Sequence, residues 1–109
     1  QAYANAGADC LYAPGLRARD EIAAVVAAVA PKPVNLLIGW TSDLTVSDVA
    51  ALGVRRISVG GALARAAWGG FMRAAQLIAQ EGRFDGFADA AAGKDLNAFF
   101  GGEQGARRQ

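Results

Sequence analysis

Three times along the chain, a short apolar run ends at glycine or proline and is followed by a segment with helical spacing. The runs cover residues 9–13, 34–38 and 56–59, and the helical segments begin near Asp20, Thr45 and Gly61. Strands that alternate with helices over short connections form parallel sheets with right-handed crossovers. Nearly continuous apolar runs are typical of strands that are buried on both faces. The chain is therefore predicted to be α/β, with about three parallel βα units followed by C-terminal helices.

Local signals indicate where the helices begin and end. Asp20 is a suitable N-cap for the first helix. Thr45 and Asp48 have the spacing of a capping box, and the helix that they begin should stop at Gly53. The third helix is long and should end at Gly82.

The third apolar run meets the long helix at Gly60-Gly61, with no loop between them. Glycine lets backbone N–H groups approach a ligand closely, and the first turn of a helix carries partial positive charge. In α/β barrels, strand ends of this kind deliver residues to the active site. The pair is therefore a candidate anion-binding site, although tight strand–helix packing would explain the same residues.

Composition narrows the classes of function. The 109 residues suffice for one modest domain, and a formal net charge of +1 gives no sign of nucleic-acid or membrane binding. The chain has no histidine, which excludes Ser-His-Asp and Cys-His catalysis within it. Cys10 is the only cysteine, so no internal disulfide can form, which suits a cytoplasmic protein. The longest apolar run, residues 23–30, is too short to span a bilayer.

Three segments have a recognisable order and spacing. They are Gly-Ala-Asp-Cys-Leu-Tyr-Ala-Pro-Gly at residues 7–15, Pro-Val-Asn at 33–35, and Leu-Gly-Val-Arg-Arg-Ile-Ser-Val-Gly-Gly-Ala at 52–62. Together they resemble the C-terminal part of the isocitrate lyase / phosphoenolpyruvate phosphonomutase superfamily, over about residues 1–100. The resemblance implies a portion of a (β/α)8 TIM-type barrel and a Mg²⁺-dependent enzyme. Such enzymes cleave or form C–C or P–C bonds in small α-oxo or α-hydroxy carboxylates.

The resemblance also implies four substrate-binding positions besides Gly60 and Gly61. Asn35 falls on a strand-tip asparagine that contacts substrate, and Arg65 falls on an arginine just after the last strand, where a guanidinium can grip a carboxylate. Lys94 falls near a later basic residue that reaches substrate in the lyases. Gly15 stands where the lyases carry a glutamate, which favours the phosphonomutase-like branch. Each position also has a plainer interpretation. Asn35 could be a turn residue, Arg65 a solvated helix arginine and Lys94 a surface lysine.

The superfamily's metal-binding acidic residues lie in the N-terminal half of its barrel, and nothing in this chain matches them. The Mg²⁺ ligands are therefore expected outside this chain. Residues 1–7 read as the last turns of a helix without a start signal. We expect that an upstream half is missing, or that another subunit covers the sheet edge. Residues 1–100 are expected to form the partial barrel domain, and residues 101–109 a flexible tail.

The resemblance thus implies a C-terminal fragment of a lyase or mutase that holds part of a carboxylate site and is inactive alone, with no catalytic residue assigned. The resemblance also implies a homo-oligomer that exchanges a late helix, and Gly69-Gly70 in the long helix would suit a close helix contact. Two alternatives stay open. One is a half-barrel structural or binding module that oligomerises, and the other is part of a different phosphate-binding TIM-barrel enzyme with phosphate at Gly60-Gly61.

Overall fold

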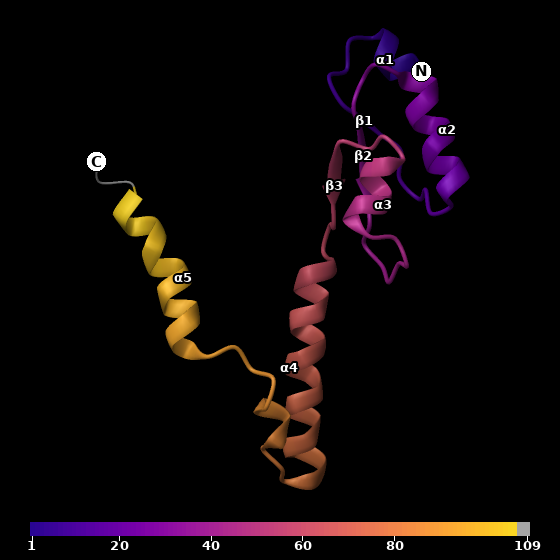
Figure 1. Ribbon diagram of the computed structural model, residues 1–109. Coiled ribbons are helices and arrows are strands. Elements are labelled where there is room, and N and C mark those ends of the chain that lie inside the picture. Colours follow the sequence, from indigo (N-terminus) through magenta and orange to yellow (C-terminus); the bar gives the residue numbers. More distant parts are fainter. Residues whose placement is uncertain (107–109) are drawn as a thin grey trace. The chain divides into compact units, whose positions relative to one another are not determined.

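A computed structural model describes residues 1–106 of the chain. The chain forms two compact units, Gln1–Ala66 and Ala67–Gln109. The boundary between them falls inside the long helix α4 (Ala62–Glu81; Figure 1).

The first unit contains a three-stranded parallel sheet in the order β1–β2–β3. Strand β1 is Leu11–Tyr12, β2 is Val34–Leu37 and β3 is Arg56–Ser58. The register aligns Tyr12 with Asn35, and Asn35 in turn with Arg56. The prediction of an α/β fold with three parallel strands is confirmed, and each strand lies within its predicted apolar run.

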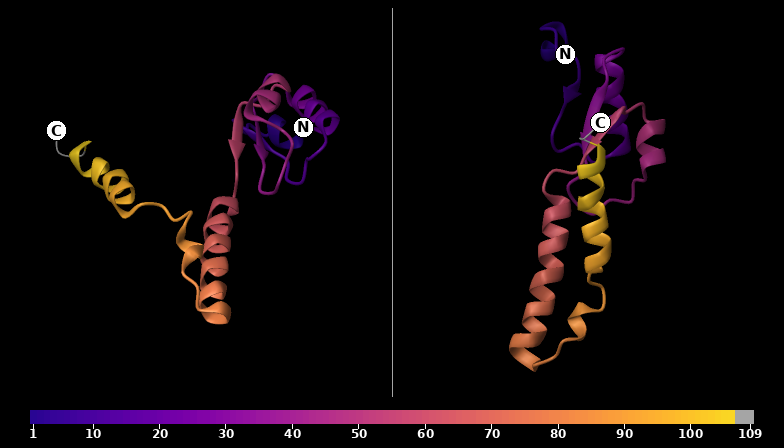
Figure 2. Two further views of the ribbon diagram at one scale, coloured as in Figure 1. Left: turned by 60° about the horizontal axis from the view of Figure 1, so that its bottom comes forward. Right: turned by 90° about the vertical axis from the view of Figure 1, so that its left-hand side faces the viewer.

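Helices cover one face of this sheet (Figure 2). They are α1 (Ala2–Asn5), α2 (Arg19–Val29) and α3 (Val46–Ala51). Ile22 of α2 and Val49 of α3 are fully buried against Leu36 of β2. A second cluster joins the start of β2 to β1 and the end of α2, through Leu11, Val29 and Val34. Alternate residues of β2 therefore supply the core, and the residues between them face away from these helices.

Only β2 is buried along most of its length, so the prediction of strands buried on both faces is wrong for β1 and β3. Tyr12 is 52% exposed, Arg56 is exposed and Ser58 is half-buried. In β3, Arg56 and Ser58 alternate with Ile57, and only Ile57 packs against the helical core. The sheet thus has one apolar face and one polar face.

The predicted capping box at the start of α3 is confirmed. Thr45 Oγ1 accepts a hydrogen bond from the Asp48 N–H at 3.1 Å, and Asp48 Oδ2 accepts one from the Thr45 N–H at 2.8 Å. The predicted ends of α3 and α4 are also confirmed, because Gly53 and Gly82 follow them with φ of 90° and 65°.

The prediction of Asp20 as an N-cap is wrong. Helix α2 begins one residue earlier, at Arg19, and Ala18 occupies the capping position. The Ala18 N–H donates to the Glu21 carboxylate at 3.4 Å, so an acidic side chain reaching back replaces the expected cap. Asp20 lies in the first turn instead, where its charge still favours the helix dipole.

The second unit continues α4 and adds a 3-10 helix, η1 (Asp85–Phe87), and helix α5 (Gly93–Ala106). Gly86 packs closely on α4, since a Cβ at this position would lie 2.9 Å from Ala74 Cα. Residues 101–106 of the predicted tail are helical, and residues 107–109 lie outside the described residues. The domain limits of 1–100 and 101–109 stay a prediction. No helix in the described part of the chain is long and apolar enough to cross a membrane.

Candidate functional site

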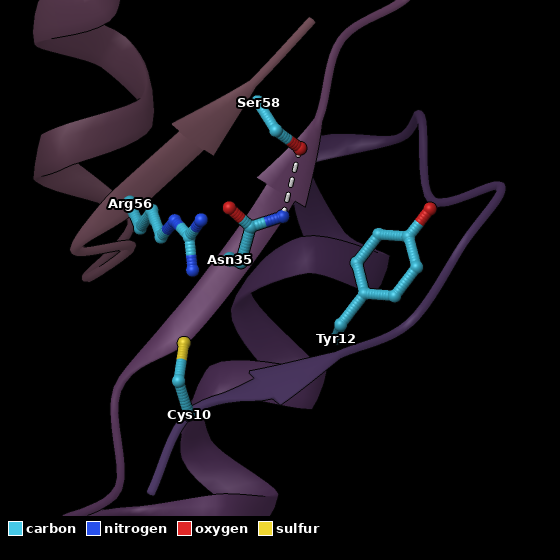
Figure 3. A pocket seen from close by; sticks show the side chains of 5 residues that line it. All are labelled: Cys10, Tyr12, Asn35, Arg56 and Ser58. Atoms are coloured by element: carbon cyan, nitrogen blue, oxygen red, sulfur yellow. Dashed lines mark hydrogen bonds between the residues drawn. The ribbon is translucent and has the colours of Figure 1, made fainter. Parts of the chain in front are cut away.

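The polar face of the sheet carries a shallow pocket of about 250 Å³. We call it the Asn35 pocket. Its lining residues are Cys10, Tyr12, Asn35, Arg56 and Ser58. Strand alternation and the parallel register place these side chains on one face, although they come from three separate stretches of sequence (Figure 3).

Asn35 is the most constrained side chain of the pocket. It is only 7% exposed, and its Nδ2 donates a hydrogen bond to Ser58 Oγ at 2.9 Å. Its Oδ1 is buried and has no hydrogen-bond partner among the described residues. A buried acceptor left unpaired costs about 1–3 kcal/mol. A donor that reached this oxygen from the pocket would therefore remove that cost.

The charge of the pocket comes from Arg56. Its guanidinium is positively charged, and among the side chains that the structure describes, those of residues 1–102, no ion pair or hydrogen bond engages it. None of the described residues that line the pocket is a carboxylate. The pocket therefore presents an unbalanced positive charge to any small molecule that enters.

Ser58 adds a second polar group. Because its oxygen accepts a hydrogen bond from Asn35, its hydroxyl proton is free to donate elsewhere. The pocket thus offers a guanidinium fork, a hydroxyl donor and one buried amide oxygen. The guanidinium and the hydroxyl can both donate to a carboxylate, whereas the amide oxygen can only accept from a donor.

Arg65 lies outside the Asn35 pocket. Its Nη2 donates to the backbone oxygen of Gly39 at 2.6 Å. Arg17, from the loop after β1, stacks on the Trp40 ring at 4.4 Å from its centroid. Two arginines therefore hold the start of the loop between β2 and α3, a role for Arg65 that the sequence did not predict.

The other predicted site residues are dispersed. Asn35 is the second residue of β2, so the predicted strand-tip position is wrong, because the strand continues to Leu37. Gly60, with φ of 53°, and Gly61 join β3 to α4, and Gly15 follows β1 with φ of 86°. Lys94 lies in α5, in the second unit. Of all the predicted residues, only Asn35 lines the pocket.

The described residues do not fit the Mg²⁺ that the resemblance implies. Among the side chains of residues 1–102, which the structure describes, no three from His, Cys, Asp or Glu gather as metal ligands would. Magnesium prefers carboxylate oxygens and water, whereas the Asn35 pocket offers an arginine that would repel a cation. Any metal chemistry would have to come from groups outside the described residues.

Sequence reasoning missed Arg56, Ser58 and Tyr12. Residues 56–59 are interpreted from the sequence as a nearly continuous apolar run, although polar and apolar residues alternate in it. That alternation, aligned with Asn35 by the parallel register, is the signal that could have identified the pocket.

Comparison with known proteins assigns the chain to a family. The model of the phosphoenolpyruvate phosphomutase family matches residues 1–79, well over half of the chain. The chain belongs to the phosphoenolpyruvate phosphomutase family. The matched region of this phosphomutase-family chain contains the whole Asn35 pocket and Arg65, whereas Lys94 lies beyond it.

Solved structures agree with this assignment. A lyase/mutase from Burkholderia cenocepacia J2315 is 52% identical over 91% of this chain and 36% of its own, with a TM-score of 0.83. Oxaloacetate acetylhydrolase, solved with its product oxalate, is 29% identical over 76% of this chain and 30% of its own, with a TM-score of 0.64. For 2,3-dimethylmalate lyase, 20% identity over 94% of this chain and 37% of its own, with a TM-score of 0.71, shows a shared fold alone.

The phosphomutase-family chain thus spans about a third of the length of these proteins. No curated protein matches it. The superfamily resemblance seen in the sequence is confirmed.

Proposed function

We propose that the first unit supplies one wall of a small-carboxylate site in a lyase or mutase of this superfamily. The reactions of such an enzyme break or form C–C or P–C bonds in α-oxo or α-hydroxy carboxylates. The observation that carries the proposal is the Asn35 pocket, where the described part of the chain gives Arg56 no counter-ion and the buried oxygen of Asn35 no partner. Family membership supports the same class of substrate.

The proposal places the Asn35 pocket inside a (β/α)8 barrel. In such barrels, helices cover the outer face of the strands, and the opposite face lines the interior. Here α2 and α3 cover the apolar face of the sheet, and the pocket lies on the other. In this arrangement the metal ligands and the reacting groups belong to strands that this chain does not contain.

Each pocket residue then has a binding role. Arg56 receives the substrate carboxylate through two parallel hydrogen bonds, which a guanidinium forms better than an ammonium does. Ser58 donates its free hydroxyl proton to an oxygen of the same ligand. Arg65 positions the loop after β2 through Gly39, at the carboxyl edge where barrel substrates enter.

Calorimetric titration with oxalate tests this proposal. Oxalate is the product bound in the oxaloacetate acetylhydrolase structure, and it offers only carboxylate oxygens. Arg56→Gln should weaken oxalate binding by at least about tenfold, since a charge-assisted pair is lost. Arg55→Gln is the matched control, because it removes the same charge one residue away, outside the pocket. Equal weakening by both substitutions would overturn the proposal.

The proposal also expects no turnover by this chain alone. With Mg²⁺ and oxaloacetate or phosphonopyruvate supplied, the product should not accumulate above the uncatalysed rate. Robust turnover would show that the chain holds a complete catalytic site and would contradict the proposal.

A second candidate, a half-barrel module that oligomerises, is supported by the surface of α4. The helix exposes Trp68, Phe71 and Met72, three large apolar side chains at helical spacing. We propose that this surface forms a contact between copies of the chain, as the resemblance implies. No observation favours the alternative of a different phosphate-binding barrel, because the family match assigns the chain elsewhere.

A further inference from the structure

We propose that Asn35 makes the pocket selective for 2-hydroxycarboxylates over 2-oxocarboxylates. This inference rests on the carboxylate site proposed above and concerns the group on the carbon next to the carboxylate. Family membership and the fold leave that choice open, since both kinds of acid share the carboxylate that Arg56 would bind.

The unpaired oxygen of Asn35 carries the argument. A 2-hydroxy acid has an O–H that can donate to Asn35 Oδ1, whereas a 2-oxo acid has only another acceptor at that position. A 2-oxo acid would leave the buried Oδ1 unpaired, as it is in the chain alone, whereas the hydroxyl of a 2-hydroxy acid would pair it. The pocket therefore discriminates by a missing donor, a kind of discrimination that binding sites perform well.

The orientation of the amide is set by its neighbours. Nδ2 is directed to Ser58 Oγ, and Oδ1 lies on the side of Arg56 (Figure 3). The opposite orientation would turn the NH₂ group toward the guanidinium, where two sets of donors would face each other. The acceptor thus belongs on the Arg56 side of the pocket.

Strand geometry puts the two contacts at the correct spacing for one small acid. Asn35 and Arg56 are direct neighbours across the β2–β3 pair, and adjacent strands lie about 4.8 Å apart. A carboxylate on Arg56 therefore brings the adjoining carbon and its hydroxyl to Asn35. No residue from the second unit is needed for this contact.

The charge of the pocket separates hydroxy acids from amino acids. An ammonium on the same carbon also has protons to donate, but it would lie beside Arg56 in a pocket that no carboxylate lines. Like charges at short range disfavour that ligand. A hydroxyl next to the carboxylate can donate to Asn35 and adds no positive charge beside Arg56, so it suits both residues.

Titration with three acids of the same carbon skeleton tests the inference. Lactate carries the hydroxyl (both enantiomers are used), pyruvate carries the oxo group, and propionate carries neither. We expect the better lactate enantiomer to bind about tenfold more tightly than pyruvate, the value of one hydrogen bond to a buried acceptor. L-alanine should bind more weakly than lactate. These measurements use the unaltered chain, so they do not depend on a variant that folds.

Asn35→Leu removes the amide and retains a side chain of similar size. In this variant the lactate-to-pyruvate affinity ratio should fall to about one, while Arg56 still binds the carboxylate of both. Asn97→Leu, the same substitution at an exposed position of α5, should leave the ratio unchanged. Circular dichroism melting curves establish that each variant is folded before its affinities are compared.

The outcomes separate this inference from the carboxylate site itself. Equal, Arg56-dependent binding of lactate and pyruvate would overturn the selectivity and leave the carboxylate site standing. An unchanged ratio in Asn35→Leu would also overturn it, as would alanine binding as tightly as lactate. If none of these acids nor oxalate binds, both the carboxylate site and its selectivity are wrong.

Discussion

Asp48 shows how far a half-buried carboxylate near the surface can depart from its ordinary pKa. Its pKa falls from 3.8 to about 2, first because the Thr45 hydroxyl donates to its carboxylate, then because of the Thr45 N–H and Arg19. A lowered pKa means that the charged carboxylate stabilises the folded chain. That contribution is fully present above about pH 4 and is lost as the pH falls toward 2.

Thr45→Ala should lower the free energy of unfolding by about 1 kcal/mol near neutral pH, because the hydroxyl that accepts from the Asp48 N–H and donates to the Asp48 carboxylate is lost. The bond from the backbone N–H of residue 45 to Asp48 remains. Urea denaturation at pH 7 and at pH 2 measures the effect, and the difference from the unaltered chain should shrink at the lower pH. Thr41→Ala, in the exposed loop before α3, is the control. A comparable loss there would show that the cap is not responsible.

For single residues, the sequence predicted some members of the site and missed others. Asn35 was identified through the family resemblance, which implies a strand-tip position, whereas the structure places it second in β2. Arg56 and Ser58 could not be identified from local sequence, because their meaning depends on register with β2. Arg65 was identified, but its contact with Gly39 depends on a loop 26 residues earlier in the chain.

The turn between α3 and β3 tests packing between elements. Gly53 has φ of 90°, and a Cβ there would lie 2.8 Å from Val26 Cγ1 of α2. Gly53→Ala should therefore destabilise the chain by about 2 kcal/mol, since backbone strain and a clash add together. Gly82→Ala is a matched control, with φ of 65° but nothing within 4 Å of the added atom. Thermal melting should show the smaller shift for Gly82→Ala, and equal shifts would contradict this account of α2–α3 packing.

The loop between β2 and α3 tests the role of Arg65. Arg65→Met removes the hydrogen bond to Gly39, so amide hydrogen exchange over residues 39–44 should become faster. Arg73→Met makes the same change two turns later in α4 and should leave that loop unaffected. Exchange rates that do not differ between the two variants would show that Arg65 does not position the loop.

The positions of the strands and helices were predicted more reliably than the sides of the strands that face the core. Turn residues and helical spacing located the three strands and the helices of the first unit, because those signals act within a few residues. The polar face of the sheet was not predicted. Which side of a strand faces the core is decided by α2 and α3, which contact the sheet only in the folded chain.

At the scale of the whole molecule, the oligomeric state tests whether the exposed surface of α4 forms a contact between copies of the chain. Gly69→Leu adds a branched side chain beside the exposed Trp68 and Phe71. Within the described residues, an added Cβ at Gly69 would approach only the Arg73 side chain of the same helix. If another copy packs there, light scattering should show a smaller mass for Gly69→Leu than for the unaltered chain. An unchanged mass would contradict the proposed contact.

The central claim is that a small carboxylate binds on the polar face of the sheet. The most direct measurement is an NMR titration with oxalate that follows the side-chain amides of the three asparagines, Asn5, Asn35 and Asn97. Only the Asn35 signals should shift, saturating together with the backbone amides of Arg56 and Ser58. Oxalate binding that leaves the Asn35 and Arg56 signals unmoved would contradict the account.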